Sequence, residues 1–233
     1  MTDTIRGISS MATRALLAEL LTAFTEKSGV VVTMESVGGV DAARRVQAGE
    51  AFDWVVLASD AIDRLIAGGH LRAGSRVDLV RSDVAVAVRA GASLPDISTE
   101  ASLRAAVLAA ASIGYSTGPS GTALMRLFDR WGIADALQGR LVQAQPGVPV
   151  ASMVARGEVA LGFQQLSEML GQPGIEVIGP LPQPVQIVTT FSAGAPLQVA
   201  AGSELAERLK ALQAFITAPP AALIISRHGM APA

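Results

Sequence analysis

Residues 44–60, RRVQAGEAFDWVVLASD, contain the transition that decides the fold: the end of one helix, a turn, a strand and the start of another helix. The pattern predicts a short helix over 41–48 that ends at Gly49, a residue type that readily takes the left-handed conformation that closes helices. It then predicts a continuous hydrophobic strand over 53–58 and a helix capped by Ser59 and the aspartate that follows it. A fully apolar strand between two helices indicates a parallel sheet covered on both faces.

The same alternation extends along the rest of the chain. The hydrophobic periodicity predicts the strands 4–9, 30–37, 77–88, 112–115, 140–144, 159–164 and 185–192. It predicts the further helices 11–27, 99–110, 120–131, 148–156, 203–217 and 219–227. Together with the opening stretch, these elements predict an α/β protein built from βαβ units.

Two of the strands are long enough to pass between two sheets. They are 77–88 and 185–192, and the strand–helix rhythm restarts after the first of them. We therefore expect two lobes, each a mostly parallel sheet flanked by helices, joined by two crossover strands. Lobe one would be 1–81 plus 186–233 and lobe two 82–185, with a ligand cleft between them.

Composition excludes several classes of partner. The 233 residues are 50% apolar and 16% charged, with a net charge of −2 and no long run of one sign, so nucleic acid is not an expected partner. Apolar stretches end well short of the ~20 residues that a membrane span needs, so no membrane insertion is expected. The N-terminal MTDTIRG lacks the pattern of a signal peptide. The expected location is therefore cytoplasmic as the chain is written, or periplasmic if a signal peptide was removed.

No metal, nucleotide or other cofactor is expected. The chain has no cysteine and only two histidines, His70 and His228, neither of which has partners at a spacing suited to a triad or zinc site. The glycine-rich phosphate loops, the zinc-binding HExxH motif and the serine-nucleophile elbow are all absent from the sequence.

Small and hydroxyl-bearing residues recur where a predicted strand meets the next helix. Such junctions can bind an anion, because free backbone N–H groups and the positive end of the helix dipole point at the ligand. A single junction is better explained as an ordinary N-cap, but five in one chain favour an anion site. The five junctions contain Ser9 and Ser10, Gly38 and Gly39, Ser59, residues 116–121, and residues 147–149.

Three segments carry a resemblance to a known family: residues 44–60, Pro119-Ser120-Gly121 and the VALGF of 159–163. In element order and in these segments the whole chain resembles the type II periplasmic-binding-protein fold, most closely the molybdate-binding proteins of ABC transporters. The resemblance implies a small anionic ligand between two lobes and, as a possible partner, an ABC permease.

The residues that would bind molybdate in that family are largely replaced here. The first family serine falls at or beside Met11, the second falls on Gly39, and the family tyrosine falls on Gln165. These replacements remove side-chain donors suited to a compact tetrahedral oxyanion and add an amide. They favour an organic acid with one or more carboxylates over molybdate.

Two further residues have open roles. Arg14 would bind a carboxylate bidentately or lie on a solvated helix face, and Tyr115 would supply a pocket hydroxyl or pack in the core. The full set of expected ligand-binding residues is Ser9, Ser10, Met11, Arg14, Gly38, Gly39, Ser59, Tyr115, Ser120, Gly121, Val148, Gln164 and Gln165.

Two functions stay open. The first is a binding protein that delivers an organic acid to a transporter; the alternative is an isomerase on the same scaffold, because some proteins that resemble this family are aconitate isomerases, which shift a proton within a tricarboxylic acid. Candidate bases for that chemistry are Glu35, Asp41 and Tyr115, although Glu35 also suits a strand surface and Asp41 a helix cap. A ligand sensor is less favoured, since no DNA-binding segment accompanies the lobes.

Overall fold

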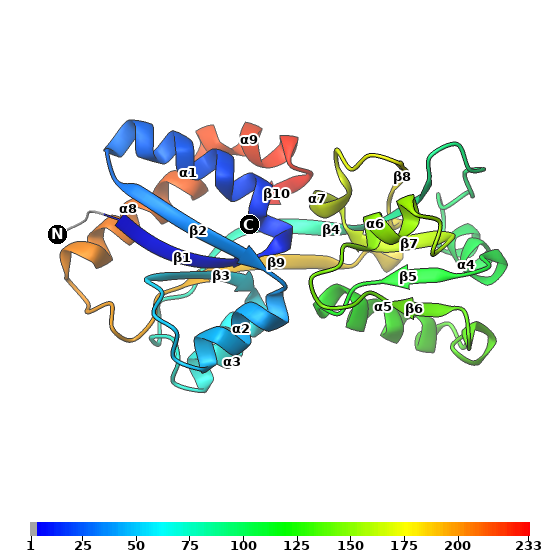
Figure 1. Cartoon of the computed structure of the whole chain (residues 1–233), viewed down its shortest axis with the longest axis horizontal. Helices are drawn as coiled ribbons and strands as arrows, with labels where there is room; N and C mark the ends of the chain where they lie inside the picture. The colour runs from blue at the N-terminus through cyan, green and yellow to red at the C-terminus, as the bar shows by residue number, and fades with distance from the viewer. Residues whose placement is uncertain (1–3) are drawn as a thin grey trace. The chain divides into compact units, whose positions relative to one another are not determined.

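The computed structural model describes residues 4–233 and divides into two compact units. Unit 1 extends to Arg81 and resumes at Thr190, and unit 2 is Ser82–Thr189. The chain passes between the units within two strands, β4 (Val77–Arg89) and β9 (Val188–Gly194) (Figure 1). The second crossing lies at Thr190, where the sequence predicts it at 186.

Unit 1 contains a sheet whose first three strands are parallel. The central strand β1 (Thr4–Ser10) pairs with β2 (Val31–Val37) on one side and with β3 (Trp54–Ala58) on the other. β3 pairs in turn with β9 in the antiparallel direction. The short β10 (Met230–Pro232) pairs with β4.

Helices cover both faces of this sheet. One face packs against α1 (Arg14–Ser28), α8 (Glu204–Thr217) and α9 (Ala222–Arg227) through residues such as Leu20, Trp54 and Leu212. The other face packs against α2 (Gly39–Gln47) and α3 (Ser59–Ala67) through Val55 and Ile62. β3 is apolar along its whole length because its alternating side chains enter these two cores. The helical elements of unit 1 are η1 (Met11–Thr13), α1 (Arg14–Ser28), α2 (Gly39–Gln47), α3 (Ser59–Ala67), α8 (Glu204–Thr217), η4 (Pro219–Ala221) and α9 (Ala222–Arg227).

Unit 2 has a mixed sheet. β5 (Ile113–Tyr115) lies parallel to β6 (Leu141–Gln143) and β7 (Leu161–Gln165), while β4 runs antiparallel to β7 and β8 (Ile175–Pro180). Val86, Phe128 and Phe163 belong to its largest core. Its helical elements are α4 (Glu100–Ala109), α5 (Pro119–Arg130), η2 (Asp135–Leu137), α6 (Val150–Ala155), α7 (Leu166–Met169) and η3 (Gln183–Val185).

Four local features differ from the sequence-based expectations. The first helix begins with the 3-10 turn η1 rather than as a regular α-helix at residue 11. Ser59 is the first residue of α3 and not its cap, because Ala58 occupies the cap position without a side-chain hydrogen bond. β8 and α7 were not predicted: β8 is only partly buried along its length, and the four residues of α7 are too few to display a period.

Among residues 4–233, no single helix is long and apolar enough to cross a membrane. α8 and α9 meet the length and composition required only as a pair, which is bent by 57°.

Candidate functional site

The strand directions bring the predicted site residues to one edge of each sheet. In unit 1 the parallel strands β1, β2 and β3 end at Ser10, Val37 and Ala58, so the junctions that follow them share an edge. In unit 2 the parallel strands β5, β6 and β7 likewise end at a common edge. Ligands of open α/β sheets bind at the carboxyl ends of parallel strands. Each unit therefore has one edge suited to a ligand.

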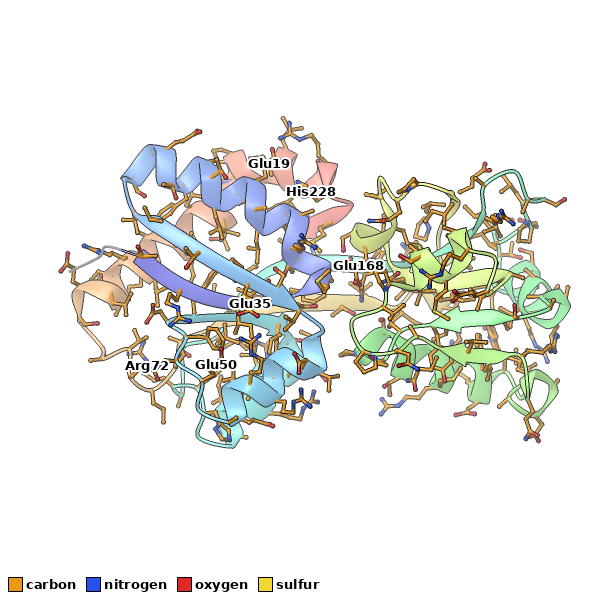
Figure 2. All side chains as sticks on the ribbon, in the orientation of Figure 1. Glu19, Glu35, Glu50, Arg72, Glu168 and His228 are labelled. Atoms are coloured by element: carbon orange, nitrogen blue, oxygen red, sulfur yellow. The ribbon has the colours of Figure 1, made fainter. Side chains whose placement is uncertain are left out.

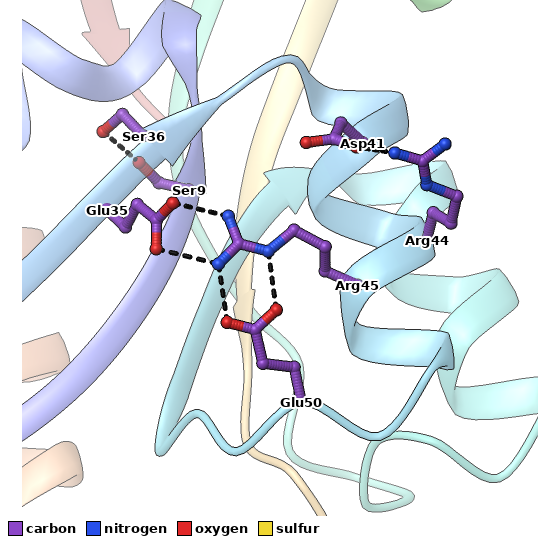
Figure 3. A network of polar contacts seen from close by, with 7 residues as sticks. All are labelled: Ser9, Glu35, Ser36, Asp41, Arg44, Arg45 and Glu50. Carbon is purple, nitrogen blue, oxygen red and sulfur yellow. Dashed lines mark hydrogen bonds and ion pairs between the residues drawn. The ribbon is translucent and has the colours of Figure 1, made fainter.

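The two serines that end β1 are engaged within unit 1. Ser9 is fully buried and its Oγ lies 2.8 Å from the Oγ of Ser36 on β2 (Figure 3). Ser10 accepts a hydrogen bond from the backbone N–H of Ala12 at 3.3 Å and so caps η1. A Cβ added to Gly39 would lie 3.7 Å from Ser10 Oγ, so the structure brings the β1 and β2 junctions together.

The other predicted residues of unit 1 have different surroundings. Gly38 caps α2, and Met11 is half-buried in η1. Arg14 is exposed and lines a surface cavity of about 650 Å³ along α1 and β2, beside Thr22 and Glu26. Among its described lining residues, that cavity contains no other member of the predicted ligand-binding set.

The two carboxylates of unit 1 that the sequence offers as bases are held by arginines (Figure 3). Both oxygens of Glu35 accept from the Arg45 guanidinium, at 2.5 and 2.9 Å, and Arg45 also binds Glu50. These hydrogen bonds hold the pKa of Glu35 below its usual value, and Asp41 forms an ion pair with Arg44. Glu35 is therefore a structural ion pair and a weak base, which corrects its role as a candidate.

The β5–α5 junction of unit 2 is tightly built. Ser120 is 7% exposed and its Oγ lies 2.9 Å from that of Ser116. A Cβ at Gly121 would lie 1.9 Å from the Ser116 carbonyl oxygen, so only glycine allows this approach. α5 has neither a side-chain cap nor an acidic residue in its first turn, which suits an anion. Tyr115, the last residue of β5, packs half-buried against the unit 2 core.

A second polar group lies where β7 ends. Gln164 is 3% exposed, and its Oε1 accepts from the backbone N–H of Ala151 at 3.0 Å. Gln165 is 4% exposed and donates through Nε2 to Thr189 Oγ1 at 2.7 Å. The Oε1 of Gln165 and the Oγ of Ser167 are buried without a hydrogen-bond partner among residues 4–233. Buried polar atoms are normally paired, so these two atoms indicate a place for a ligand or water.

Glu168, in the first turn of α7, was not identified from the sequence (Figure 2). Its side chain is half-buried, and burial raises its pKa to about 7, opposed by a hydrogen bond with the Gln164 side chain. A carboxyl group with this pKa is populated in both protonation states at neutral pH. The sequence shows only a glutamate three residues after a pair of glutamines. The desolvation of this glutamate is visible only in the tertiary structure. We call Gln165, Ser167 and Glu168 the β7–α7 corner.

Two further expectations concern Val148 and the histidines. The backbone N–H of Val148 donates to the carbonyl oxygen of Gln145 at 2.9 Å, so it is already used within a turn.

His228 does have a partner: its Nε2 lies 2.8 Å from Glu19 on α1, and Arg227 binds the same carboxylate. This trio connects α9 to α1. Residues 4–233 contain no group of three or more His, Cys, Asp or Glu side chains suited to a metal ion.

Comparison with known proteins relates the chain to solute-binding proteins. The family "Bacterial extracellular solute-binding protein" matches residues 5–231. An aconitate isomerase of Pseudomonas sp. is 34% identical over 235 residues, covering 98% of this chain and 88% of that protein.

Two solved structures are similar to this one over nearly their whole length. The periplasmic molybdate-binding protein of Azotobacter vinelandii has a TM-score of 0.78 at 19% identity, covering 97% of this chain and 98% of that one. PEB3 of Campylobacter jejuni with L-phospholactate bound has a TM-score of 0.73 at 15% identity, covering 97% and 99%. These likenesses show the periplasmic-binding-protein fold that the sequence predicts.

Proposed function

The chain belongs to the bacterial extracellular solute-binding proteins, and from this membership we propose that it binds a small organic acid with several carboxylates and interconverts its isomers. The proposed reaction is the aconitate-isomerase type: a double bond moves within a tricarboxylic acid as a proton is shifted.

The observation that carries this proposal is the whole-chain similarity to an aconitate isomerase. At 34% identity over 98% of the chain, that relative shares more of the sequence than the molybdate-binding protein, which is 19% identical. The latter likeness concerns the fold, and a fold alone does not specify a ligand.

The site chemistry also favours an organic acid. By the resemblance to the molybdate-binding family, that family's hydroxyl donors fall at or beside Met11, on Gly39 and on Gln165. Gly39 leaves space next to Ser10 Oγ, and Gln165 supplies an amide instead of a phenol. The space at Gly39 in unit 1 and the amide of Gln165 in unit 2 each suit planar carboxylates better than a tetrahedral oxyanion.

The proposed reaction needs only acid–base chemistry. A base removes a proton from the CH₂ next to the double bond, and the electron pair moves to form the new double bond. The proton is added to the carbon at the other end of the three-carbon unit, so no oxidant or cofactor is consumed. Hydrogen-bond donors at the strand ends would stabilise the negative charge that develops on the substrate carboxylates.

The direct test is incubation of the protein with cis-aconitate and, separately, with trans-aconitate, followed by proton NMR. We expect both reactions to reach the same mixture of isomers. Thermal unfolding with molybdate or tungstate provides the comparison, and we expect neither oxyanion to stabilise the fold as the tricarboxylate does. Absence of interconversion, or strong stabilisation by molybdate alone, contradicts the proposal.

A second candidate is solute delivery to an ABC permease from a periplasmic location. Membership of the solute-binding family favours it. This function requires tight binding without turnover, so calorimetry with tricarboxylates combined with the NMR assay separates the two. Binding with no change of isomer would support delivery.

A further inference from the structure

We infer that Glu168 is the acid–base residue that removes the substrate proton and returns it, an inference that rests on the proposed isomerisation. The supporting observations are the position of Glu168 in α7, which directly follows β7, the unpaired polar atoms beside it in sequence, and the hydrogen-bonded Gln164 at the end of β7.

The topology brings Glu168 to the edge of unit 2 that is suited to a ligand. β7 lies next to β5 in the parallel direction, with Tyr115 in register with Phe163. The chain that follows β5 leads into the Ser116–Ser120 pair, and the chain that follows β7 leads directly into α7. Glu168 is thus on the same edge as the predicted anion-binding junction, whereas Glu35 is tied to Arg45.

The β7–α7 corner contains polar atoms that the described protein leaves unsatisfied. Gln165 Oε1 can only accept a hydrogen bond, and Ser167 Oγ can also donate one. Each such buried atom is unfavourable when it has no partner, because it has lost its hydrogen bond to water. A polycarboxylic acid offers both complements: carboxylate oxygens for the serine hydroxyl and a protonated carboxyl group or a bound water for the amide oxygen.

The surroundings of Glu168 explain why it can both accept and donate a proton. α7 packs on β7 and β8, and its Met169 also packs against Ala85 and Ala87 of β4 and Ala151 of α6. The other charged side chains on these elements are Glu176 on β8 and Asp78, Arg81, Asp83 and Arg89 on β4, and none of them is among the causes of the pKa shift of Glu168. Burial is the main cause of its raised pKa of about 7, and the hydrogen bond with Gln164 limits the rise. A general base is most effective when its pKa is close to the working pH.

The proposed step balances in protons and electrons. The ionised Glu168 takes a proton from the substrate CH₂ and becomes a carboxylic acid, while the C–H electron pair enters the allylic system and its charge spreads onto a substrate carboxylate. Glu168 then returns the proton to the opposite carbon and is ionised again. Because the aconitate skeleton is symmetric about its central carbon, this shift gives aconitate again, and the new double bond has the opposite geometry when the CH₂ arm is held in the opposite orientation as its proton is removed.

The test compares Glu168→Gln with the matched control Glu176→Gln in the isomerisation assay. Loss of a general base lowers rates by about 10²–10⁴-fold, so we expect kcat of the Glu168 variant to fall at least 100-fold. We expect its calorimetric Kd for propane-1,2,3-tricarboxylate, which has no double bond, to stay within about fivefold of the wild type, since one hydrogen bond is worth about 1 kcal/mol. Deuterium incorporation into the substrate from D₂O should disappear with turnover, and Glu176→Gln should retain both.

The outcomes separate the inference from the function on which it rests. A folded Glu168→Gln variant that turns over within about threefold of the wild type overturns the role of Glu168 and leaves the isomerase function intact. If the wild type converts neither isomer, the proposed function itself fails and the inference with it. For a Glu168→Gln variant that does not fold, Glu168→Asp provides the same comparison: it keeps a carboxylate, so a changed pH profile of kcat is expected and an unchanged profile contradicts the role.

Discussion

The polar side chains at the strand ends of the two units differ in how completely they are hydrogen-bonded. In unit 1, Ser9 binds Ser36, Ser10 caps η1, and Glu35 is held by Arg45. In unit 2, the β7–α7 corner contains two buried atoms without a partner among residues 4–233 and a carboxyl group whose pKa burial raises to about 7. Satisfied groups stabilise a fold, whereas unsatisfied ones cost free energy that a ligand can recover. The unpaired atoms and the desolvated carboxyl group are the features of unit 2 on which the proposed chemistry rests.

The largest expected effect on stability comes from Gly121, one of two glycines in the first turns of helices that follow strands. Gly121→Ala should reduce the free energy of unfolding by about 3 kcal/mol, because the new methyl group would lie 1.9 Å from the Ser116 carbonyl oxygen. Gly39→Ala should change it by less than about 0.5 kcal/mol, since its nearest neighbour is Ser10 Oγ at 3.7 Å. Urea unfolding of both variants measures the contrast. Equal losses of unfolding free energy in the two variants would show that the two junctions accept an added methyl group equally well.

An effect of at most the same size concerns the pH dependence of stability. The folded pKa of Glu168 is about 7 and its ordinary value is 4.5, so between these pH values the native state binds more protons than the unfolded state. Wild-type stability should therefore fall as the pH rises through this window, by at most about 3 kcal/mol. Glu168→Gln should lack that part of the fall.

The measurement is urea unfolding of the wild type and Glu168→Gln at pH 4 and pH 8. The variant should gain stability relative to the wild type on going from pH 4 to pH 8. A difference between the two proteins that does not change with pH would show that Glu168 is not desolvated in the native state.

The smallest expected effect is on the unit 1 side of the comparison. Glu35→Gln should leave the isomerisation rate within about twofold of the wild type, because Arg45 already holds this carboxylate ionised and its pKa is lowered. The NMR turnover assay at pH 7 measures it. A 100-fold lower isomerisation rate would show that the base lies in unit 1 and not in unit 2.

Much of the fold was accessible from sequence because its signals are local. The apolar strand β3 between two helices indicated the parallel sheet, and the predicted helices 99–110 and 203–217 correspond to α4 and α8, which Thr99 and Ser203 cap. β8 and α7 were missed because neither carries a clear period over enough residues.

The site was less accessible, for a physical reason. The sequence pattern predicted that Ser10, Ser120 and Gln165 lie next to strand ends. It gives no information on the desolvation of a side chain or on hydrogen bonds between residues distant in sequence. Arg45, ten positions from Glu35, removes one candidate base, and burial of α7 creates another at Glu168. Both effects depend on tertiary packing, which a single sequence does not contain.

The most direct test of the account is a ¹³C NMR titration of the Glu168 side-chain carboxyl carbon, assigned by comparison with Glu168→Gln, with and without propane-1,2,3-tricarboxylate. The account requires a midpoint near pH 7 in the free protein and a shifted midpoint when the tricarboxylate is bound. A midpoint near 4.5 that does not respond to the tricarboxylate would contradict the proposed acid–base role of Glu168 at the β7–α7 corner.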